Sequence, residues 1–189
     1  CMPGMTEGHG HLSFENVTAT EGLITPTPEE QVFAAARGAK ALVEAGFTSV
    51  YGASEAKLRL GVAVRNEVNA GRIPGPRIRA GGLEISVTGA MGDESTEHNP
   101  RIGPSTLVDG PEAMRKMVRF QIREGVDNIK LDVTGDPFYA WRAGTLGTPA
   151  DCTTMHFDEI KMAVDTAHAL GRKVNAHTRS IEGSKLCLR

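Results

Sequence analysis

This sequence has little cysteine, few aromatic side chains and no long apolar run. Three cysteines in 189 residues form no Cys-x-x-Cys pair, which argues against a disulfide framework and favours a reducing, cytoplasmic compartment. The net charge of −2 comes without basic blocks, and aromatic residues make up 5%, so no nucleic-acid partner is predicted. No segment approaches the about 18–20 consecutive apolar residues of a membrane span, so no membrane association is expected.

What the chain does contain is typical of a globular protein. Apolar residues make up 40% and charged residues 23%, which is enough for one sizeable hydrophobic core. The sequence starts without an initiator methionine, and residues 180–189 have the character of a helix that has only begun. We therefore expect residues 1–189 to be one incomplete domain of a longer protein.

A strand-like run, a loop and an amphipathic helix repeat along the chain. Thr27 and Pro28 provide a helix start, and Gly46, Gly71 and Gly171 provide helix ends. Strands are predicted up to residue 11 and over 47–51, 77–82, 128–133 and 173–177. Helices are predicted over 27–46, 58–70, 111–124 and 157–170, with long loops over 84–109 and 134–155.

Five strands alternating with four helices predict a parallel sheet, because parallel neighbours need crossovers of this length. An open doubly wound sheet and a closed barrel both fit this order. No Gly-x-Gly-x-x-Gly motif follows the first strand, which weakens a dinucleotide-binding interpretation, and the long loops are typical of barrel enzymes. We therefore expect an α/β fold, a (β/α)8 TIM-type barrel of which about the first five βα units are present.

The segment Glu7-Gly8-His9-Gly10-His11 is the first candidate for chemistry. Side chains two residues apart on a strand share a face, with Cα atoms roughly 6.5–7 Å apart, so both imidazoles can reach one divalent cation. Neutral imidazole is the commonest metal ligand near neutral pH. Taken alone, the pattern fits two histidines on a polar strand face equally well.

Lys130 and His177 occupy matching places in later predicted strands. Parallel strands end at the same edge of a sheet, so these two side chains and the N-terminal histidines are expected to meet there. That convergence favours a metal site. The alternatives are that Lys130 is a buried lysine paired with Asp132 or Asp136, and that His177 is a hydrogen-bonding core residue.

Several segments, taken in order, resemble the metal-dependent amidohydrolases, in particular their imidazolonepropionase-like and Xaa-Pro dipeptidase-like branch. They are PGMTEGHGH (3–11), GPRI (75–78), TGAMGD (88–93), DNIK (127–130) and KVNAH (173–177). The similarity runs almost from end to end of the chain, and the ordered combination is far more specific than any single segment.

The resemblance implies two divalent metal ions, with Zn²⁺ as the expected metal. It implies that His9 and His11 hold the more buried ion and that His177 holds the second. Lys130 would bridge both ions as a CO₂-derived carbamate, which makes it a catalytic residue; burial beside cations favours the neutral amine that this requires. An unmodified lysine and a mononuclear site remain alternatives. The family completes its site with a later histidine and aspartate, which lie outside this sequence.

Three residues bear on how the site and its substrate differ from the family pattern. Glu7 stands where the family usually has aspartate, so the contact that orients a histidine can differ. Arg179 replaces a neutral polar residue and either binds an anionic group of the substrate or forms a salt bridge at the barrel rim. Tyr139, in the loop after the fourth strand, either lines a substrate pocket or packs within its own loop.

The predicted function is hydrolysis of an amide-type C–N bond, in a dipeptide, N-acyl amino acid, urea or carbamate, by metal-activated hydroxide. The expected partners are a small-molecule substrate and further copies of the chain in a homo-oligomer. One alternative is a catalytically incomplete half-barrel, a fragment or a subunit that needs a partner, and the chain by itself is expected to be inactive. The other is a mononuclear deaminase or cyclic amidase of the same superfamily.

Overall fold

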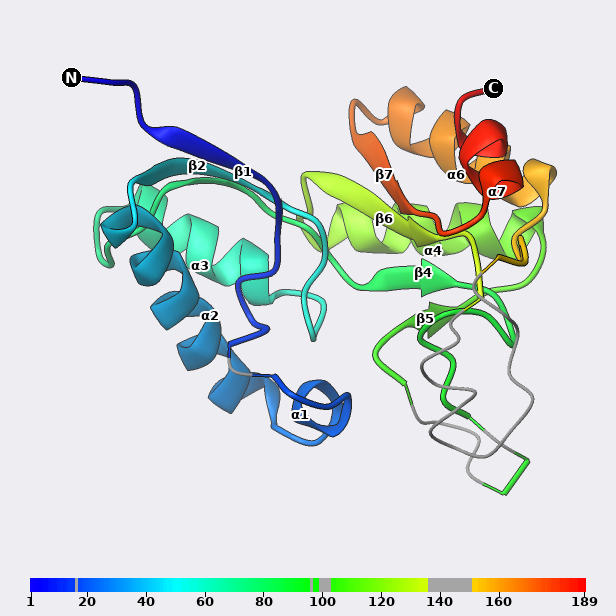
Figure 1. Ribbon diagram of the computed structural model, residues 1–189, viewed down its shortest axis with the longest axis horizontal. Helices are drawn as coiled ribbons and strands as arrows, with labels where there is room; N and C mark the ends of the chain where they lie inside the picture. Colours follow the sequence, from blue (N-terminus) through cyan, green and yellow to red (C-terminus); the bar gives the residue numbers. More distant parts are fainter. Residues whose placement is uncertain (16, 96, 99–102, 136–150) are drawn as a thin grey trace. The chain divides into compact units, whose positions relative to one another are not determined.

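The computed structural model describes residues 1–15, 17–95, 97–98, 103–135 and 151–189 (Figure 1). In chain order the elements are β1 (Met5–Gly10), α1 (Glu21–Ile24), α2 (Pro28–Glu44), β2 (Phe47–Gly52), α3 (Leu60–Asn69), β3 (Arg77–Arg79), β4 (Glu84–Ser86), β5 (Thr106–Leu107), α4 (Pro111–Arg123), β6 (Asn128–Asp132), α6 (Phe157–Ala169), β7 (Lys173–His177) and α7 (Ile181–Cys187). All four predicted helices are present within two residues of their predicted bounds.

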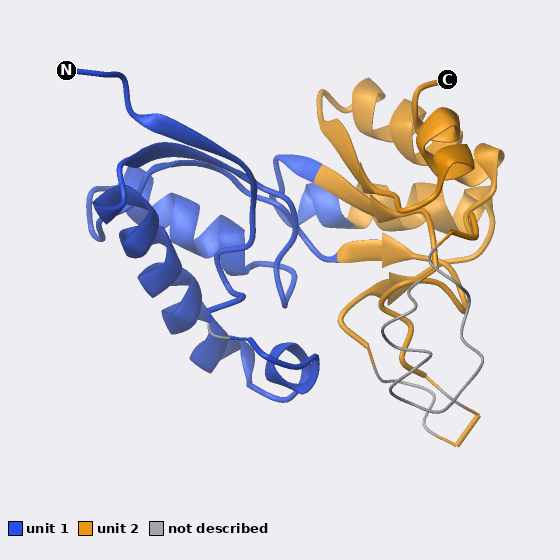
Figure 2. Ribbon diagram, viewed as in Figure 1, with its two compact units in different colours: residues 1–83, 121–128 blue, residues 84–120, 129–189 orange. Residues whose placement is uncertain are grey.

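The chain divides into two compact units, each with its own parallel pairings. Unit 1 contains residues 1–83 and 121–128, and unit 2 contains residues 84–120 and 129–189 (Figure 2). Unit 1 holds a sheet in the order β1-β2-β3, and the sheet β5-β4-β6-β7 lies in unit 2 apart from the first residue of β6. The pairings β1–β2, β2–β3, β4–β5 and β4–β6 are parallel, as the alternation of strands and helices predicts.

The predicted third strand, over 77–82, is wrong in its extent. Only residues 77–79 of that range form a strand, β3, which pairs with β2, and a separate strand, β4, follows at 84–86 and pairs with β6. The predicted loop from residue 84 therefore begins with a strand. The glycines that indicate a loop, Gly89 and Gly92, come only after this strand, in which Glu84 lies on one face while Ile85, with no exposed surface, lies on the other.

Helix α2 in unit 1 begins and ends where the sequence predicts. The Thr27 hydroxyl accepts the N–H of Glu30 at 3.3 Å, and the Glu30 carboxylate accepts the N–H of Thr27 at 2.9 Å, which forms a capping box. Gly46 follows the helix with φ of +92°, a conformation that favours glycine. Helices α2 and α3 lie on the same side of the β1–β3 sheet (Figure 1). The four-residue helix α1 is not predicted, because it is too short to show an apolar period.

The end of β2 and the chain after β3 approach each other closely in unit 1. A Cβ atom on Gly52 would lie 2.8 Å from the carbonyl oxygen of Arg79, and one on Gly81 would lie 2.5 Å from the carbonyl oxygen of Gly52. The Asn128 amide donates to the same carbonyl oxygen of Gly52 at 2.9 Å. Only glycine at both positions allows the two backbones to come this close.

Unit 2 has its own hydrophobic core between its sheet and helices. Its nearly or fully buried side chains include Ile85, Met114, Val118, Leu131 and Ile160. Met114 and Val118 lie on the face of α4 that the apolar spacing predicts. The helix expected over 180–189 is also present as α7, where the Ser180 hydroxyl accepts the N–H of Gly183 at 2.8 Å.

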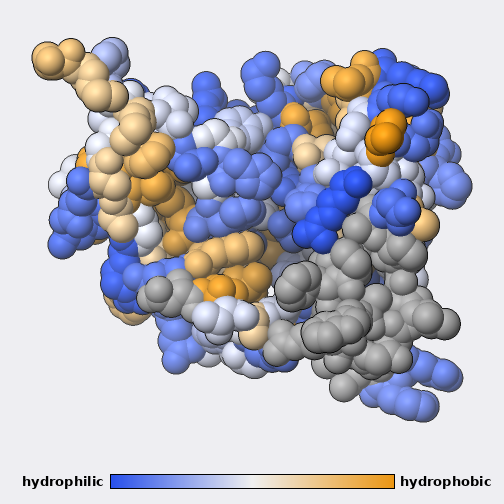
Figure 3. Space-filling view, viewed as in Figure 1, coloured by the Kyte–Doolittle hydropathy of each residue, from blue (hydrophilic) through white to orange (hydrophobic). Residues whose placement is uncertain are grey.

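Apolar side chains are exposed near both ends of the chain. They include Met2, Ile181 and Leu188, and orange and tan atoms gather near both termini in the space-filling view (Figure 3). None of the helices within the described residues is long and apolar enough to cross a membrane.

Candidate functional site

His9 and His11 lie at the end of β1 in unit 1, and their rings are close together. The ring centroids are 5.1 Å apart, and the ring planes meet at 65°. The pairing of β1 with β2 shifts register between Glu7 and Gly10, so the strand is not regular at this point. The proximity that the His-x-His spacing predicts is therefore confirmed, although a local irregularity of the strand accompanies it.

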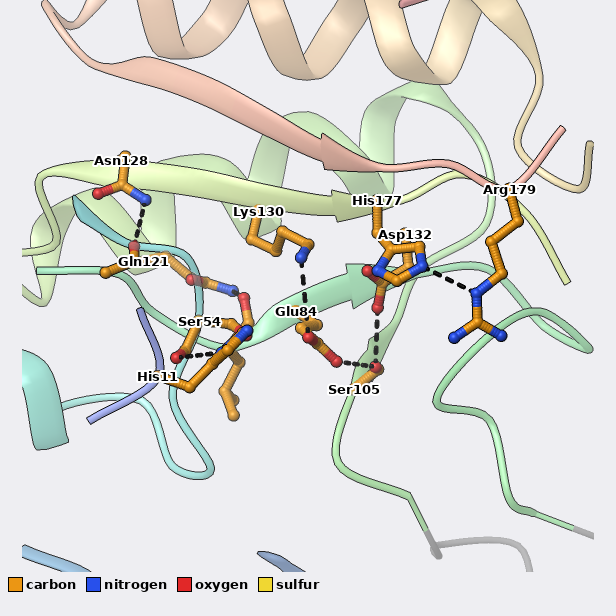
Figure 4. Close-up of polar contacts among 12 residues, drawn as sticks. His11, Ser54, Glu84, Ser105, Gln121, Asn128, Lys130, Asp132, His177 and Arg179 are labelled. Atoms are coloured by element: carbon orange, nitrogen blue, oxygen red, sulfur yellow. Dashed lines mark hydrogen bonds and ion pairs between the residues drawn. The ribbon is translucent and has the colours of Figure 1, made fainter. Parts of the chain in front are cut away.

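The His11 ring is held by the loop after β2. Its Nδ1 atom lies 3.0 Å from both the carbonyl oxygen and the hydroxyl of Ser54 (Figure 4), and the ring stacks on Phe14 with centroids 4.4 Å apart. A proton on Nδ1 satisfies the carbonyl oxygen, which only accepts hydrogen bonds, and in that tautomer the lone pair of the neutral ring is on Nε2. Histidines that bind metals commonly donate their second ring N–H in this way.

Glu55, in the same loop, is a buried carboxylate that sequence reasoning missed. It is 2% exposed and accepts the N–H of Leu12 at 3.3 Å, the N–H of Ser13 at 2.9 Å and the hydroxyl of Ser13 at 2.6 Å. Burial raises the pKa of Glu55 to about 7, against the opposing effect of these hydrogen bonds. Nothing in the sequence pattern marks this glutamate, because its partners lie about forty residues away.

A hollow of about 410 Å³ lies beside the two histidines in unit 1. His9 and His11 line it together with Gly38, Ala41 and Leu42 of α2. Glu7 also lines this hollow, and its carboxylate accepts the backbone N–H of His9 at 2.8 Å. Glu7, which stands where the family usually has aspartate, therefore contacts the backbone of His9, a candidate metal ligand.

Lys130 lies on β6 in unit 2 and is 1% exposed. Within the described residues its Nζ makes no hydrogen bond, and it forms an ion pair with Glu84 Oε1 at 4.0 Å (Figure 4). Glu84 lies opposite Lys130 in the parallel pairing of β4 and β6. The ion pair is with Glu84, which corrects the expected partner Asp132, whereas the other expected partner, Asp136, lies outside the described residues and stays a prediction.

Asp132 adds a second buried carboxyl group on the same face of β6 as Lys130. The Ser105 hydroxyl lies 3.3 Å from Asp132 Oδ2 and 3.3 Å from Glu84 Oε2 (Figure 4). Burial and the negative charge of Glu84 hold the pKa of Asp132 well above its usual range, while Lys130 acts in the opposite direction.

His177 ends β7 in unit 2 and is bound by Arg179. The Arg179 Nε–H donates to His177 Nε2 at 3.0 Å (Figure 4). A guanidinium group only donates, so Nε2 accepts with its lone pair and the proton of the neutral ring is on Nδ1. Neither role expected for Arg179, anion binding or a rim salt bridge, includes this contact.

The candidate ligands are divided between the two compact units. The N-terminal histidines belong to unit 1, whereas Lys130, His177 and Arg179 belong to unit 2. Tyr139 lies outside the described residues. Across the part of the chain that the structure describes, no three His, Cys, Asp or Glu side chains gather into a metal-binding group. The meeting of all four ligands at one centre stays a prediction.

The described side chains fit divalent metal ions as ligands. His11 Nδ1 is bound to Ser54, and imidazoles held through one ring nitrogen in this way commonly bind a metal ion through the other. The amine of Lys130 is buried and makes no hydrogen bond within the described residues. Such an amine suits a further partner, either CO₂ or, when neutral, a metal ion. Glu84, which sequence reasoning missed, had one available signal, the alternation of polar and apolar residues over 84–87.

A family model, described as "Amidohydrolase family", matches residues 1–187. The chain belongs to the amidohydrolase family. This confirms the family expected from the ordered motifs.

Individual proteins similar to this amidohydrolase match nearly its whole length. An ochratoxinase of Aspergillus niger is 28% identical over 203 residues, covering 96% of this chain and 40% of the relative. The crystal structure of a prolidase complexed with N-methylphosphonate-L-proline matches 100% of this chain and 46% of its own, with a TM-score of 0.84 and 26% identity. A Xaa-Pro dipeptidase with bound methionine in its active site has a TM-score of 0.84 and 25% identity, with 98% of this chain and 45% of the other covered.

The matches confirm the Xaa-Pro dipeptidase-like branch and an α/β fold with parallel sheets. The chain spans about two fifths of the length of the curated relatives that it matches.

Proposed function

We propose that this amidohydrolase takes part in metal-dependent hydrolysis of amide-type C–N bonds in small molecules. The observation that carries the proposal is the orientation of His11, whose Nδ1 is bound to the Ser54 carbonyl oxygen at 3.0 Å. Metal-binding histidines are commonly held through their second ring nitrogen in this way, and the family of this chain includes ochratoxinase and prolidase relatives.

His9, His11, Lys130 and His177 are the proposed ligands of two divalent ions, with Zn²⁺ as the expected metal. Bound divalent ions polarise a carbonyl group and lower the pKa of a water molecule toward neutrality. The histidines of this chain supply neutral imidazole nitrogens, and for His177 this requires the guanidinium of Arg179 to release Nε2. Arg179 would then be available for an anionic group of the substrate.

Carbamate formation on Lys130 is the second part of the proposal. The neutral amine forms a bond to the carbon of CO₂ and releases a proton, which gives an anion with two oxygen donors. Two features support it: the burial of Lys130 and the lack of any hydrogen bond to its Nζ within the described residues. The new anion would stand beside Glu84, so it is stable only with cations present.

A mononuclear version is favoured by one specific observation. Lys130 already forms an ion pair with Glu84, and a protonated lysine cannot act as a metal ligand. In that version the N-terminal histidines hold a single ion and Lys130 stays unmodified, as in the proposed deaminase or cyclic amidase alternative. A count of one metal ion per chain together with an unmodified lysine mass would select it.

The substrates that fit the proposal are dipeptides, N-acyl amino acids, ureas and carbamates. The named relatives include a prolidase and a Xaa-Pro dipeptidase, which favours peptide-like substrates. Tyr139 is proposed as a substrate-binding residue on its sequence position alone. A cytoplasmic location, a homo-oligomeric assembly and inactivity of this chain by itself are further parts of the proposal.

The test is the metal content of the purified chain and of His9→Ala, His11→Ala and Lys130→Ala variants, with His168→Ala as a control because His168 is exposed on α6. We expect bound metal in the parent chain and in the control, and a loss in the N-terminal histidine variants. A loss in Lys130→Ala as well would support the dinuclear version. Unchanged metal content in all three variants would rule out the proposed centre.

A further inference from the structure

The side chain of Glu55, in the loop after β2, binds the two residues that follow His11. Glu55 accepts hydrogen bonds from Leu12 and Ser13, which follow His11 in the chain. The Ser13 hydroxyl also accepts the N–H of Ala56 at 2.9 Å. Two stretches of chain about forty residues apart are therefore joined by four hydrogen bonds.

Glu55 is itself held firmly within unit 1. Its backbone N–H donates to the carbonyl oxygen of Gly82 at 2.8 Å. Its side chain passes against α3 at Gly61, where an added Cβ atom would lie 3.3 Å from Glu55 Cγ and 3.3 Å from Oε1. The carboxylate therefore has a fixed base and little freedom to move.

Ser54 connects this arrangement to the His11 imidazole. Ser54 directly precedes Glu55, and both its carbonyl oxygen and its hydroxyl lie 3.0 Å from His11 Nδ1. Glu55 therefore holds two things in place. One is the backbone of residues 12 and 13, directly after His11, and the other is Ser54, which binds the His11 ring.

We propose that Glu55 is a positioning residue for His11: it sets the direction in which His11 Nε2 faces by tying residues 12 and 13 to the Ser54–Glu55 loop. The proposal rests on the proposed function for its consequence, because the direction of Nε2 matters for catalysis only if His11 binds metal. The positioning itself can be measured without metal.

The first experiment measures the positioning by nuclear magnetic resonance on the full chain without metal. The variants are Glu55→Ala and Glu55→Gln, and the matched control is Glu159→Gln in unit 2. Glu159 is likewise a buried glutamate that accepts two backbone N–H groups, those of Gly110 at 2.6 Å and His156 at 2.8 Å. The readouts are the ¹⁵N signals of the His11 ring and the exchange rates of the Leu12 and Ser13 amide protons.

We expect Glu55→Ala to mix the two ring tautomers of His11 and to speed amide exchange at Leu12 and Ser13 at least tenfold. Glu55→Gln should lie between, because it keeps one accepting oxygen, and it carries the test if the alanine variant does not fold. Glu159→Gln should leave the His11 signals unchanged. Parent-like His11 signals in the folded Glu55 variants would overturn the proposal, and so would an equal shift in the control.

The second experiment titrates Co²⁺ into the same proteins and follows the visible absorption of the bound ion. Loss of a residue that orients a metal ligand typically weakens metal binding about ten- to a hundredfold, and we expect Glu55→Gln to fall in that range. Parent-like affinity in this variant would overturn the role of Glu55. Lack of Co²⁺ binding by the parent chain would instead overturn the proposed function, while the His11 signals still decide whether Glu55 positions the ring.

Discussion

Ser13 and Glu55 are joined twice, through the backbone N–H of Ser13 at 2.9 Å and through its hydroxyl at 2.6 Å. The two bonds end on the same carboxylate oxygen, Oε2, across 42 residues of sequence. A buried acid in this position affects the stability of the folded chain through its protonation state.

Glu55 should make the folded chain less stable as the pH rises from 5 to 8. The pKa of Glu55 is raised from 4.5 to about 7, so the folded state binds this proton more tightly than the unfolded state does. The resulting stabilisation is complete below pH 4.5 and is lost as the pH rises through 7, an effect of about 3 kcal/mol in the free energy of unfolding. Urea unfolding at several pH values measures it. Glu55→Gln should flatten this part of the profile, and an unchanged profile in that variant would refute the assignment.

Removing the charge of Lys130 should destabilise the chain strongly. Lys130→Met keeps the volume but leaves the half-buried Glu84 and the buried Asp132 without their cation, so we expect a loss of about 3–5 kcal/mol in the free energy of unfolding. The double variant Lys130→Met with Glu84→Gln should recover part of this loss. Denaturant unfolding of the single and double variants measures the coupling, and strictly additive effects would contradict the ion pair.

Gly38→Ala should destabilise the chain, although alanine is normally the better helix former. The added Cβ would lie 2.4 Å from the backbone carbonyl oxygen of Leu12, which cannot move aside as a flexible side chain could. We expect a cost of about 1–3 kcal/mol from overpacking. Gly8→Ala is the control, because nothing lies within 4 Å of its new Cβ. Thermal unfolding compares the two, and a stabilised Gly38→Ala variant would show that α2 does not pack this closely.

Arg65 should matter more to stability than an arginine in an exposed pair. Arg65 Nη1 lies 2.6 Å from Asp127 Oδ2, both side chains are less than one fifth exposed, and Asp127 also accepts the N–H of Ala80 at 2.8 Å. We expect Arg65→Ala to cost about 2–3 kcal/mol. Arg72→Ala, which breaks an exposed pair with Glu67, should produce no measurable change in the urea midpoint. Equal effects of the two substitutions would contradict this ranking.

Local signals predicted the helices and most strands well, because each of those signals acts within a few residues. Thr27 with Glu30 starts α2, and Gly46 ends it, without help from distant parts of the chain. The division of the third strand could not be predicted in the same way. It depends on β3 and β4 having different neighbours, and this is a property of the sheets rather than of the segment 77–86.

The candidate site was predictable only in part, for a similar reason. His9, His11, Lys130 and His177 stand in recognisable motifs, so the sequence and the family resemblance point to them. Glu55 could not be found because its role comes from hydrogen bonds to residues 12 and 13, far away in the sequence. Glu84 is a partial exception, since polar and apolar residues alternate over 84–87, but only four residues long and directly before a segment rich in glycine and proline.

The close approach of Gly52 and Gly81 limits how unit 1 can be redesigned. Any side chain at either place would collide with main-chain atoms, so an engineered variant must keep both glycines, whatever is changed at the candidate ligands.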